Sequence, residues 1–207
     1  MRVCPYENDI RRAFYLSLLA AVGSNGSILI SPDGSDWGTR QTPSTPKELS
    51  GIAWSGSMFA AVGEDGAILT SPDGLSWTSR ASGTSNRLHG IAWSGTQFAA
   101  VGKGGEILTS PDGASWTKHA LTTKYDLYGI AWSGEQFIAV GSAQPVASSF
   151  DGGSYTVSGG GAVVLFSTDV VTWTAQTVAI PGPLYAVAWS GKQFVAVGTR
   201  GAILTSP

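Results

Sequence analysis

Gly90-Ile91-Ala92-Trp93-Ser94-Gly95 is the stretch that decides the fold, because near-copies of it recur along this chain of 207 residues. The same pattern occupies residues 51–56 and 129–134, and residues 186–191 repeat it as Ala-Val-Ala-Trp-Ser-Gly. The tryptophans of these four stretches are Trp54, Trp93, Trp132 and Trp189. The first three are 39 residues apart and the fourth follows 57 residues later, so one unit carries an insertion of 18 residues. A fixed period of this length indicates a repeat architecture.

One repeat, residues 88–118, predicts four short antiparallel strands, over 88–93, 97–101, 106–110 and 115–118. Ser94-Gly95 suits a tight hairpin turn, the glycines of 102–105 supply positive φ, and Pro111-Asp112-Gly113 favours a reverse turn. Four strands in about 40 residues are typical of a β-propeller blade. We therefore expect an all-β fold, a single β-propeller domain over 1–207 with about five four-stranded antiparallel blades.

The blades are expected at about 12–45, 49–85, 88–124, 127–178 (with the insertion at 142–161) and 184–207. Five Val-Gly pairs mark them, and the last blade lacks its fourth strand. Either residues 1–8 supply that strand, or the chain is part of a larger propeller. An open ring would expose blade faces and strand edges, which favours association with other chains.

The N-terminal stretch 11–23 has two readings. Its two arginines followed by apolar residues resemble a secretory signal. The same stretch aligns without a gap onto residues 51–63, with Leu19 over Phe59, and the acidic Glu7 and Asp9 do not suit a signal. We favour a degenerate first repeat.

The eight tryptophans fall into two frames of the repeat, at the end of the first strand and at the start of the fourth. We expect them to pack neighbouring blades together, with carbohydrate stacking as the alternative.

Composition excludes several classes of function. Twelve basic and 14 acidic residues give a net charge of −2, which argues against nucleic-acid and anionic-membrane binding. Cys4 is the only cysteine and there are two histidines, so an intramolecular disulfide, a Cys-rich zinc site and the usual metal and cofactor motifs are not expected. No apolar run is long enough to span a membrane.

A further repeated motif, Ser-Pro-Asp-Gly-x-x-Trp, occupies residues 31–37, 71–77 and 110–116, and 167–173 carry a decayed copy. These segments resemble Asp-box (BNR-type) repeats, as in sialidases, sortilin-type receptors and photosystem II assembly-factor propellers, with one residue fewer between aspartate and glycine. The resemblance implies a propeller in which each box is a structural turn facing away from the active site, and it favours an extracellular or surface location. The implied turn residues are Ser31, Asp33, Trp37, Ser71, Asp73, Trp77, Ser110, Asp112, Trp116, Ser167, Asp169 and Trp173.

Candidate binding residues lie in the connections expected on the channel face, which differ between repeats. Ser50, His89, Tyr128 and Tyr185 share one slot before the first strand, in connections expected at 42–50, 81–89, 120–128 and 178–185. In the insertion, residues 154–158 are expected to form the core of an extra hairpin, with Phe150 and Tyr155 as aromatic contacts for a sugar or a protein. The alternative is a flexible lid that binds no ligand. Variable loops on a constant frame favour binding, and drift of exposed loops is the other explanation. The predicted ligand-binding residues are Arg87, His89, Tyr128, Tyr155, Tyr185 and Arg200.

We therefore predict a non-catalytic interaction module for a protein or glycan ligand. A sialidase-like hydrolase is one alternative, for which the resemblance implies an arginine triad, a tyrosine nucleophile with a glutamate, and an acid. The candidates for these roles are Arg40, Arg80, Arg87 and Arg200 with Tyr128 or Tyr185 and Glu48 or Glu64. However, Arg40 and Arg80 share a slot that holds His119 and Gln176 in the next repeats. An assembly factor and a structural part of a larger adhesin or phage-type protein are further alternatives.

Overall fold

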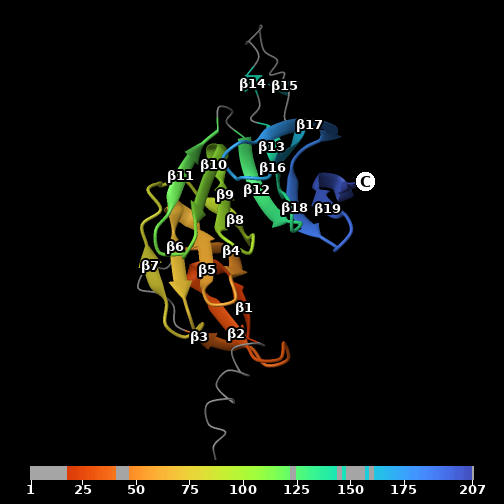
Figure 1. Cartoon of the computed structure of the whole chain (residues 1–207). Coiled ribbons are helices and arrows are strands. Elements are labelled where there is room, and N and C mark those ends of the chain that lie inside the picture. Colours follow the sequence, from red (N-terminus) through yellow and green to blue (C-terminus); the bar gives the residue numbers. More distant parts are fainter. Residues whose placement is uncertain are drawn as a thin grey trace, which may run out of the picture.

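The structure is a computed structural model, and it describes residues 18–40, 47–121, 125–143, 146–147, 157–158 and 161–206. Five antiparallel sheets of three or four strands follow one another along the chain in an arc, and a sixth sheet has two strands (Figure 1). Apart from four single-turn 3₁₀ helices, every described element is a strand. The expected all-β propeller architecture is confirmed.

We call the five sheets blades 1 to 5. Blade 1 contains β1 (Leu19–Val22), β2 (Ile28–Ser31) and β3 (Gly38–Arg40). Blade 2 contains β4 (Leu49–Trp54), β5 (Phe59–Gly63), β6 (Ile68–Ser71) and β7 (Thr78–Arg80). Blade 3 contains β8 (Leu88–Trp93), β9 (Phe98–Gly102), β10 (Glu106–Ser110) and β11 (Thr117–Ala120). Blade 4 contains β12 (Tyr125–Trp132), β13 (Phe137–Ala143), β16 (Gly161–Ser167) and β17 (Thr174–Pro181), and blade 5 contains β18 (Leu184–Trp189), β19 (Phe194–Gly198) and β20 (Ile203–Thr205).

Blades 1 and 5 have three strands each in the described residues, whereas the sequence predicts four strands in blade 1 and three in blade 5. β1 pairs with β2 just as β5 pairs with β6, so Leu19–Val22 holds the second-strand position that the alignment with the repeat assigns to it. The first strand expected near Ala13 and Phe14, and the segment 1–8, lie outside the described residues.

The connections before β12 and β18 are shorter than expected. β12 already begins at Tyr125 and β17 continues to Pro181, so much of the expected loops 120–128 and 178–185 is strand. In the insertion, β14 (Val146–Ala147) pairs with β15 (Val157–Ser158), and β14 lies outside the hairpin expected around 154–158. Phe150 and Tyr155 lie outside the described residues.

The core lies between consecutive blades. Blades 3, 4 and 5 place the phenylalanine of the second strand toward the preceding blade, and Phe98 and Phe137 are 0% and 1% exposed. The tryptophan that ends the first strand lies on this phenylalanine, with ring centroids 4.6 Å apart for Trp93 and Phe98. Large aromatic surfaces buried in this way stabilise the stack of blades, as the tryptophan frames predict.

The two ends of the arc are uncovered. Val197 and Ile203 of blade 5 are 43% and 68% exposed, whereas Val101 and Ile107, at the same positions of blade 3, are 0% exposed. At the other end, Leu19 holds the position of Phe98 and is 47% exposed. No described residue therefore covers these faces, and the described part of the chain forms an open arc.

Candidate functional site

The slot residues Ser50, His89, Tyr128 and Tyr185 all lie at β-bulges on the innermost strands. In β4 the pairing with β5 shifts between Leu49 and Gly51, and Ser50 is the residue left over. The same shift leaves over His89 in β8, Tyr128 in β12 and Tyr185 in β18. A bulge changes the direction of a side chain relative to the regular ladder. The repeated bulge therefore presents one side chain per blade at the same end of the inner strands.

Glycines bring these inner strands close together. A Cβ added to Gly90 would lie 3.2 Å from the carbonyl oxygen of Tyr128 in the next blade. Gly51 stands in the same relation to His89, and Gly129 approaches the backbone of Ala186. A larger residue would force neighbouring inner strands apart, so the glycines after Ser50, His89 and Tyr128 set the spacing of the row.

The slot side chains of blades 3 to 5 form a continuous aromatic row. The ring centroids of His89 and Tyr128 are 5.1 Å apart, and those of Tyr128 and Tyr185 are 5.5 Å apart, in tilted arrangements. His89 and Tyr128 are half-buried, whereas Tyr185 is 53% exposed. Tilted aromatic pairs at such distances attract one another. The row therefore offers a pre-formed aromatic surface that ends in an exposed phenol.

Arg87 adds charge at the blade 2 end of the row. Its guanidinium forms an ion pair with Glu48 and donates a hydrogen bond to Ser50 Oγ, 3.1 Å away. Both partners come from blade 2, so this contact joins two blades. Burial and the positive charge of Arg87 together lower the pKa of His89, which favours the neutral imidazole. We name the set Glu48, Ser50, Arg87, His89, Tyr128 and Tyr185 the inner row.

A groove of about 530 Å³ lies beside the inner row. It is lined by Lys47 and Leu49, which flank Glu48, by the turn around Asp65, and by the connection 80–85 that leads to Arg87. Lys47 and Asp65 form an exposed ion pair at 3.4 Å. The groove is therefore polar and borders the charged end of the row.

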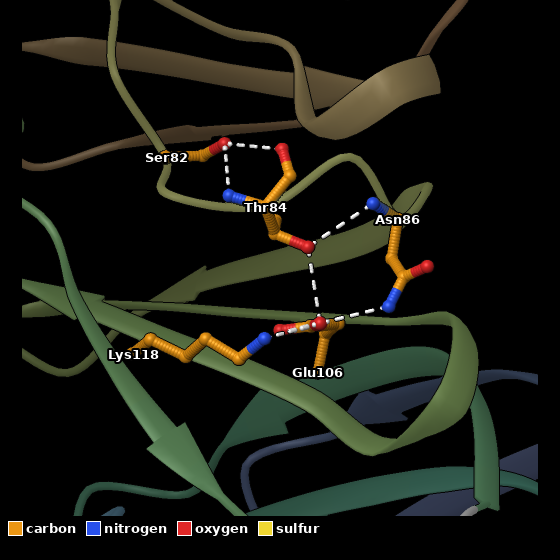
Figure 2. A network of polar contacts seen from close by, with 5 residues as sticks. All are labelled: Ser82, Thr84, Asn86, Glu106 and Lys118. Atoms are coloured by element: carbon orange, nitrogen blue, oxygen red, sulfur yellow. Dashed lines mark hydrogen bonds and ion pairs between the residues drawn. The ribbon is translucent and has the colours of Figure 1, made fainter.

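A polar network around the buried Glu106 holds the connection 82–86, which leads to Arg87 (Figure 2). Glu106 is 4% exposed and accepts hydrogen bonds from Thr84 Oγ1 at 3.0 Å and Asn86 Nδ2 at 2.8 Å. Lys118 Nζ lies 2.7 Å from the same carboxylate oxygen. Although burial raises the pKa of Glu106, the hydrogen bonds from Lys118, Asn86 and Thr84 outweigh it and lower the pKa. The ionised carboxylate thus fixes the segment that presents Arg87.

The structure brings together four of the six predicted ligand-binding residues: Arg87, His89, Tyr128 and Tyr185. Arg200 is exposed in the turn η4 (Thr199–Gly201) of blade 5, where its φ is 57°, and it forms no ion pair with any described residue. Tyr155 lies outside the described residues. Sequence reasoning missed the bulges and the pairing of Arg87 with Glu48, although the Leu-x-Gly pattern repeated at 49–51, 88–90 and 127–129 is a usable signal for the bulge.

The residues considered for a sialidase-like site lie in several blades and on both inner and outer strands. Arg80 lies on β7, the outermost strand of blade 2, and its Nε donates a hydrogen bond to Thr70 Oγ1 at 2.9 Å. His119, in the same slot of blade 3, lies 2.8 Å from Thr109 Oγ1. This slot therefore joins the two outer strands of a blade. Arg87 and Tyr128 lie at the inner strands instead, so Arg80 and Arg87 do not converge. Arg40 lies on β3, the outer strand of blade 1, and Glu64 in the turn after β5.

The Asp-box residues form a local turn in each of the four complete boxes. In blade 4, Asp169 Oδ1 accepts hydrogen bonds from the backbone N–H groups of Val171 and Thr172 at 2.9 and 2.7 Å, and these bonds lower the pKa of Asp169 to about 2. Ser167 Oγ accepts from the N–H of Val170, and Trp173 Nε1 donates to the Val170 carbonyl. The boxes of blades 1 to 3 repeat these contacts with Ser31, Asp33, Trp37, Ser71, Asp73, Trp77, Ser110, Asp112 and Trp116. In all four boxes, serine and aspartate thus accept hydrogen bonds from the backbone N–H groups of their own turn.

Comparison with solved structures supports the fold. One chain in the structure of YCF48 bound to D1 peptide superposes with a TM-score of 0.66 at 15% identity, covering 92% of this chain and 60% of that one. A chain of the nidogen/laminin complex gives a TM-score of 0.66 at 14% identity, covering 91% of this chain and 71% of that one. The fold is a β-propeller. The chain spans only 60% of the length of the matching YCF48 chain.

No family model matches the sequence, and no curated protein is similar to it. The Asp-box family membership implied by the motif is therefore not shown by sequence comparison. Among the described residues, no helix is long and apolar enough to cross a membrane. Within the same residues, no three His, Cys, Asp or Glu side chains lie together as metal ligands would.

Proposed function

We propose that this chain is a non-catalytic binding module that recognises a segment of a partner protein through the inner row. The observation that supports this most directly is the convergence of one bulged side chain from each of four blades on a single row, next to a polar groove. A repeated bulge that places Tyr, Tyr and His at 5.1 and 5.5 Å spacing is a built surface.

The composition of the row fits a protein ligand. Tyrosine and arginine are enriched among the residues that dominate binding energy at protein interfaces. Arg87 is held by Glu48 and Ser50, so little of its side-chain entropy remains to be lost on binding. We expect the tyrosines to take apolar or aromatic side chains of the ligand and the Arg87–Glu48 pair to fix its polar groups.

The structural neighbours lend further support, although they do not assign the partner. YCF48 was solved with D1 peptide bound, and nidogen was solved in complex with laminin. Both are propellers in complexes with protein ligands, and their identity to this chain is too low to transfer either ligand.

Selection from a random-peptide display library tests the proposal, with the purified full chain as the target. We expect the selected peptides to bind at least about tenfold more weakly to Tyr128→Ala and to Arg87→Ala. The matched control is Leu75→Ala, because Leu75 is 47% exposed but lies in the Asp-box turn at the opposite end of the strands. Peptides that lose affinity for the control, or for no variant, would contradict a ligand site at the inner row.

A glycan is the second candidate ligand, because exposed tyrosine rings such as that of Tyr185 also stack on sugars. A glycan array probed with the same three variants separates the two classes of ligand. Turnover of a fluorogenic sialoside by the chain, lost in Tyr128→Phe, would contradict the non-catalytic proposal.

A further inference from the structure

A cavity of about 290 Å³ opens between blades 4 and 5. Ile138, Val164 and Phe166 line it from blade 4, and Phe194, Leu204 and Ser206 line it from blade 5. A second hollow of about 540 Å³ shares Ile138, Phe166, Phe194 and Ser206 with it. Most of these residues also belong to the core between blades 4 and 5, so the cavity continues an established blade interface to the surface.

The corresponding place between blades 2 and 3 is occupied by Trp116 and the strand that follows it. Trp116 packs on the core that contains Phe98 and Leu108, which hold the positions of Phe194 and Leu204. Its ring centroid is 6.2 Å from that of Phe98, and its Nε1 donates to the Gly113 carbonyl. Trp77 and Trp173 pack in the same way on the cores in front of blades 2 and 4. Three blades of this molecule thus show what fills such a cavity: an indole and an outer strand.

The outer edge of β20 has backbone groups that a further strand could pair with. Ser206 N–H donates to the Phe194 carbonyl and Gly198 N–H donates to the Ala202 carbonyl, at 3.0 and 2.9 Å, so these residues face β19. Because ladder bonds alternate along an antiparallel strand, the amides of Ile203 and Thr205 face outward. No described strand pairs with this edge. Unpaired edges of this kind bind extended peptides by strand addition.

We propose that the cleft between blades 4 and 5 binds an extended segment of another polypeptide of the type Asp-Gly-x-x-Trp-Thr-x-x. Its indole fills the cavity against Phe194, and its backbone pairs antiparallel with β20 as the fourth strand of blade 5. The register follows from blade 3, where Thr117 lies opposite Thr109 and His119 lies opposite Ile107. The equivalent positions in blade 5 are Thr205 and Ile203.

The probe is a labelled peptide with the sequence of residues 111–120, capped at both ends and titrated against the full chain by fluorescence anisotropy. We expect saturable binding, which becomes at least about tenfold weaker when alanine replaces the tryptophan of the peptide. N-methylation at the peptide position of Thr117 or of His119 is expected to abolish binding. N-methylation at the position of Lys118, whose amide faces away from β20, is expected to leave binding within about twofold.

Two variants of the chain locate the site. Ser206→Trp tethers an indole at the cavity and is expected to weaken peptide binding at least about tenfold. Ser57→Trp, in the exposed turn between β4 and β5, is the matched control and is expected to leave binding unchanged. Circular dichroism confirms that both variants are folded.

Three results would overturn the proposal: no binding to the unmodified chain, as when a segment of the same chain fills the cleft; equal binding of the peptide without tryptophan; or equal binding to Ser206→Trp. None of these results bears on the inner row, which lies at the innermost strands, so the two proposals fail separately.

Discussion

At the residue scale, the inner row depends on one irregularity repeated four times. Each inner strand carries a single extra residue opposite the Val-Gly end of the second strand, and that residue is Ser50, His89, Tyr128 or Tyr185. A Cβ on Gly102 would collide with the Arg87 carbonyl, so the glycine of the Val-Gly pair makes room for the bulge. A position whose residue differs between repeats thus lies on a constrained feature of the backbone.

The titration of His89 reports on the charges around it. Burial and Arg87 lower the pKa of His89, whereas Asp126 and Glu48 oppose this. Replacing Arg87 with Gln removes a neighbouring cation and frees the carboxylate of Glu48, so we expect the pKa of His89 to rise, as measured by NMR titration of its ring protons. Lys192→Gln, in an exposed turn of blade 5, is the control that should leave it unchanged. A pKa that stays constant or falls in Arg87→Gln would show that the two side chains are not neighbours in solution.

The same shift makes stability depend on pH. The unfolded chain binds a proton on His89 more readily than the folded chain, since its ordinary pKa is about 6.5. Unfolding is therefore increasingly favoured as the pH falls below that value, and this contribution is smaller in Arg87→Gln.

At the scale of elements, the Asp box is a turn that organises itself through its own hydrogen bonds. Serine and aspartate accept the backbone N–H groups of the turn, and the tryptophan Nε1 donates back to the carbonyl of the glycine position. That position has positive φ in the box of every described blade that contains one, including blade 4, where Val170 replaces glycine with φ of 60°. A β-branched residue is strained there.

At a buried strand position an alanine variant is usually more stable than a glycine variant, and at Val170 we expect the opposite order. It is 1% exposed, so both Val170→Ala and Val170→Gly lose packing. Glycine also relieves the positive φ, and we expect Val170→Gly to have a free energy of unfolding about 1 kcal/mol higher than Val170→Ala. The measurement is urea denaturation. Val163, buried within β16, is the control, at which alanine should be the more stable of the two. The same order at both positions would contradict strain at Val170.

At the scale of the whole molecule, each end of the arc exposes one side of the interface that elsewhere joins two blades. Blades 3, 4 and 5 turn the second-strand phenylalanine to the blade before them, and blades 2 and 3 turn the valine of the second strand and the isoleucine of the third to the blade after them. Blade 5 presents Val197 and Ile203 with no described partner, and blade 1 presents Leu19. The end faces keep the composition of an interior interface.

A pair of equivalent substitutions tests this description. Ile107 is 0% exposed and Ile203 is 68% exposed at the same position of the repeat. We expect Ile107→Lys to destabilise the chain by about 3 kcal/mol or more, or to prevent folding, because it buries a charge between blades. Ile203→Lys is expected to change the free energy of unfolding by less than about 0.5 kcal/mol and to reduce self-association in light scattering. Comparable destabilisation by both substitutions would show that blade 5 is covered in solution.

The sequence by itself determined the propeller fold, because its signals are local and recur in each repeat. These signals are the 39-residue period, the glycine turns at fixed places and the two frames of tryptophan. It also identified the slot of His89, Tyr128 and Tyr185, since aligning repeats requires no coordinates. Only the tertiary structure decided that these side chains touch, because their spacing is set by the approach of glycine backbones from neighbouring blades. The tertiary structure also decided that Arg80 lies on the outermost strand of blade 2, whereas Arg87, close to it in sequence, directly precedes the innermost strand of blade 3. The cavity between blades 4 and 5 likewise could not be predicted from the sequence, because it arises from packing between blades, which no single repeat encodes.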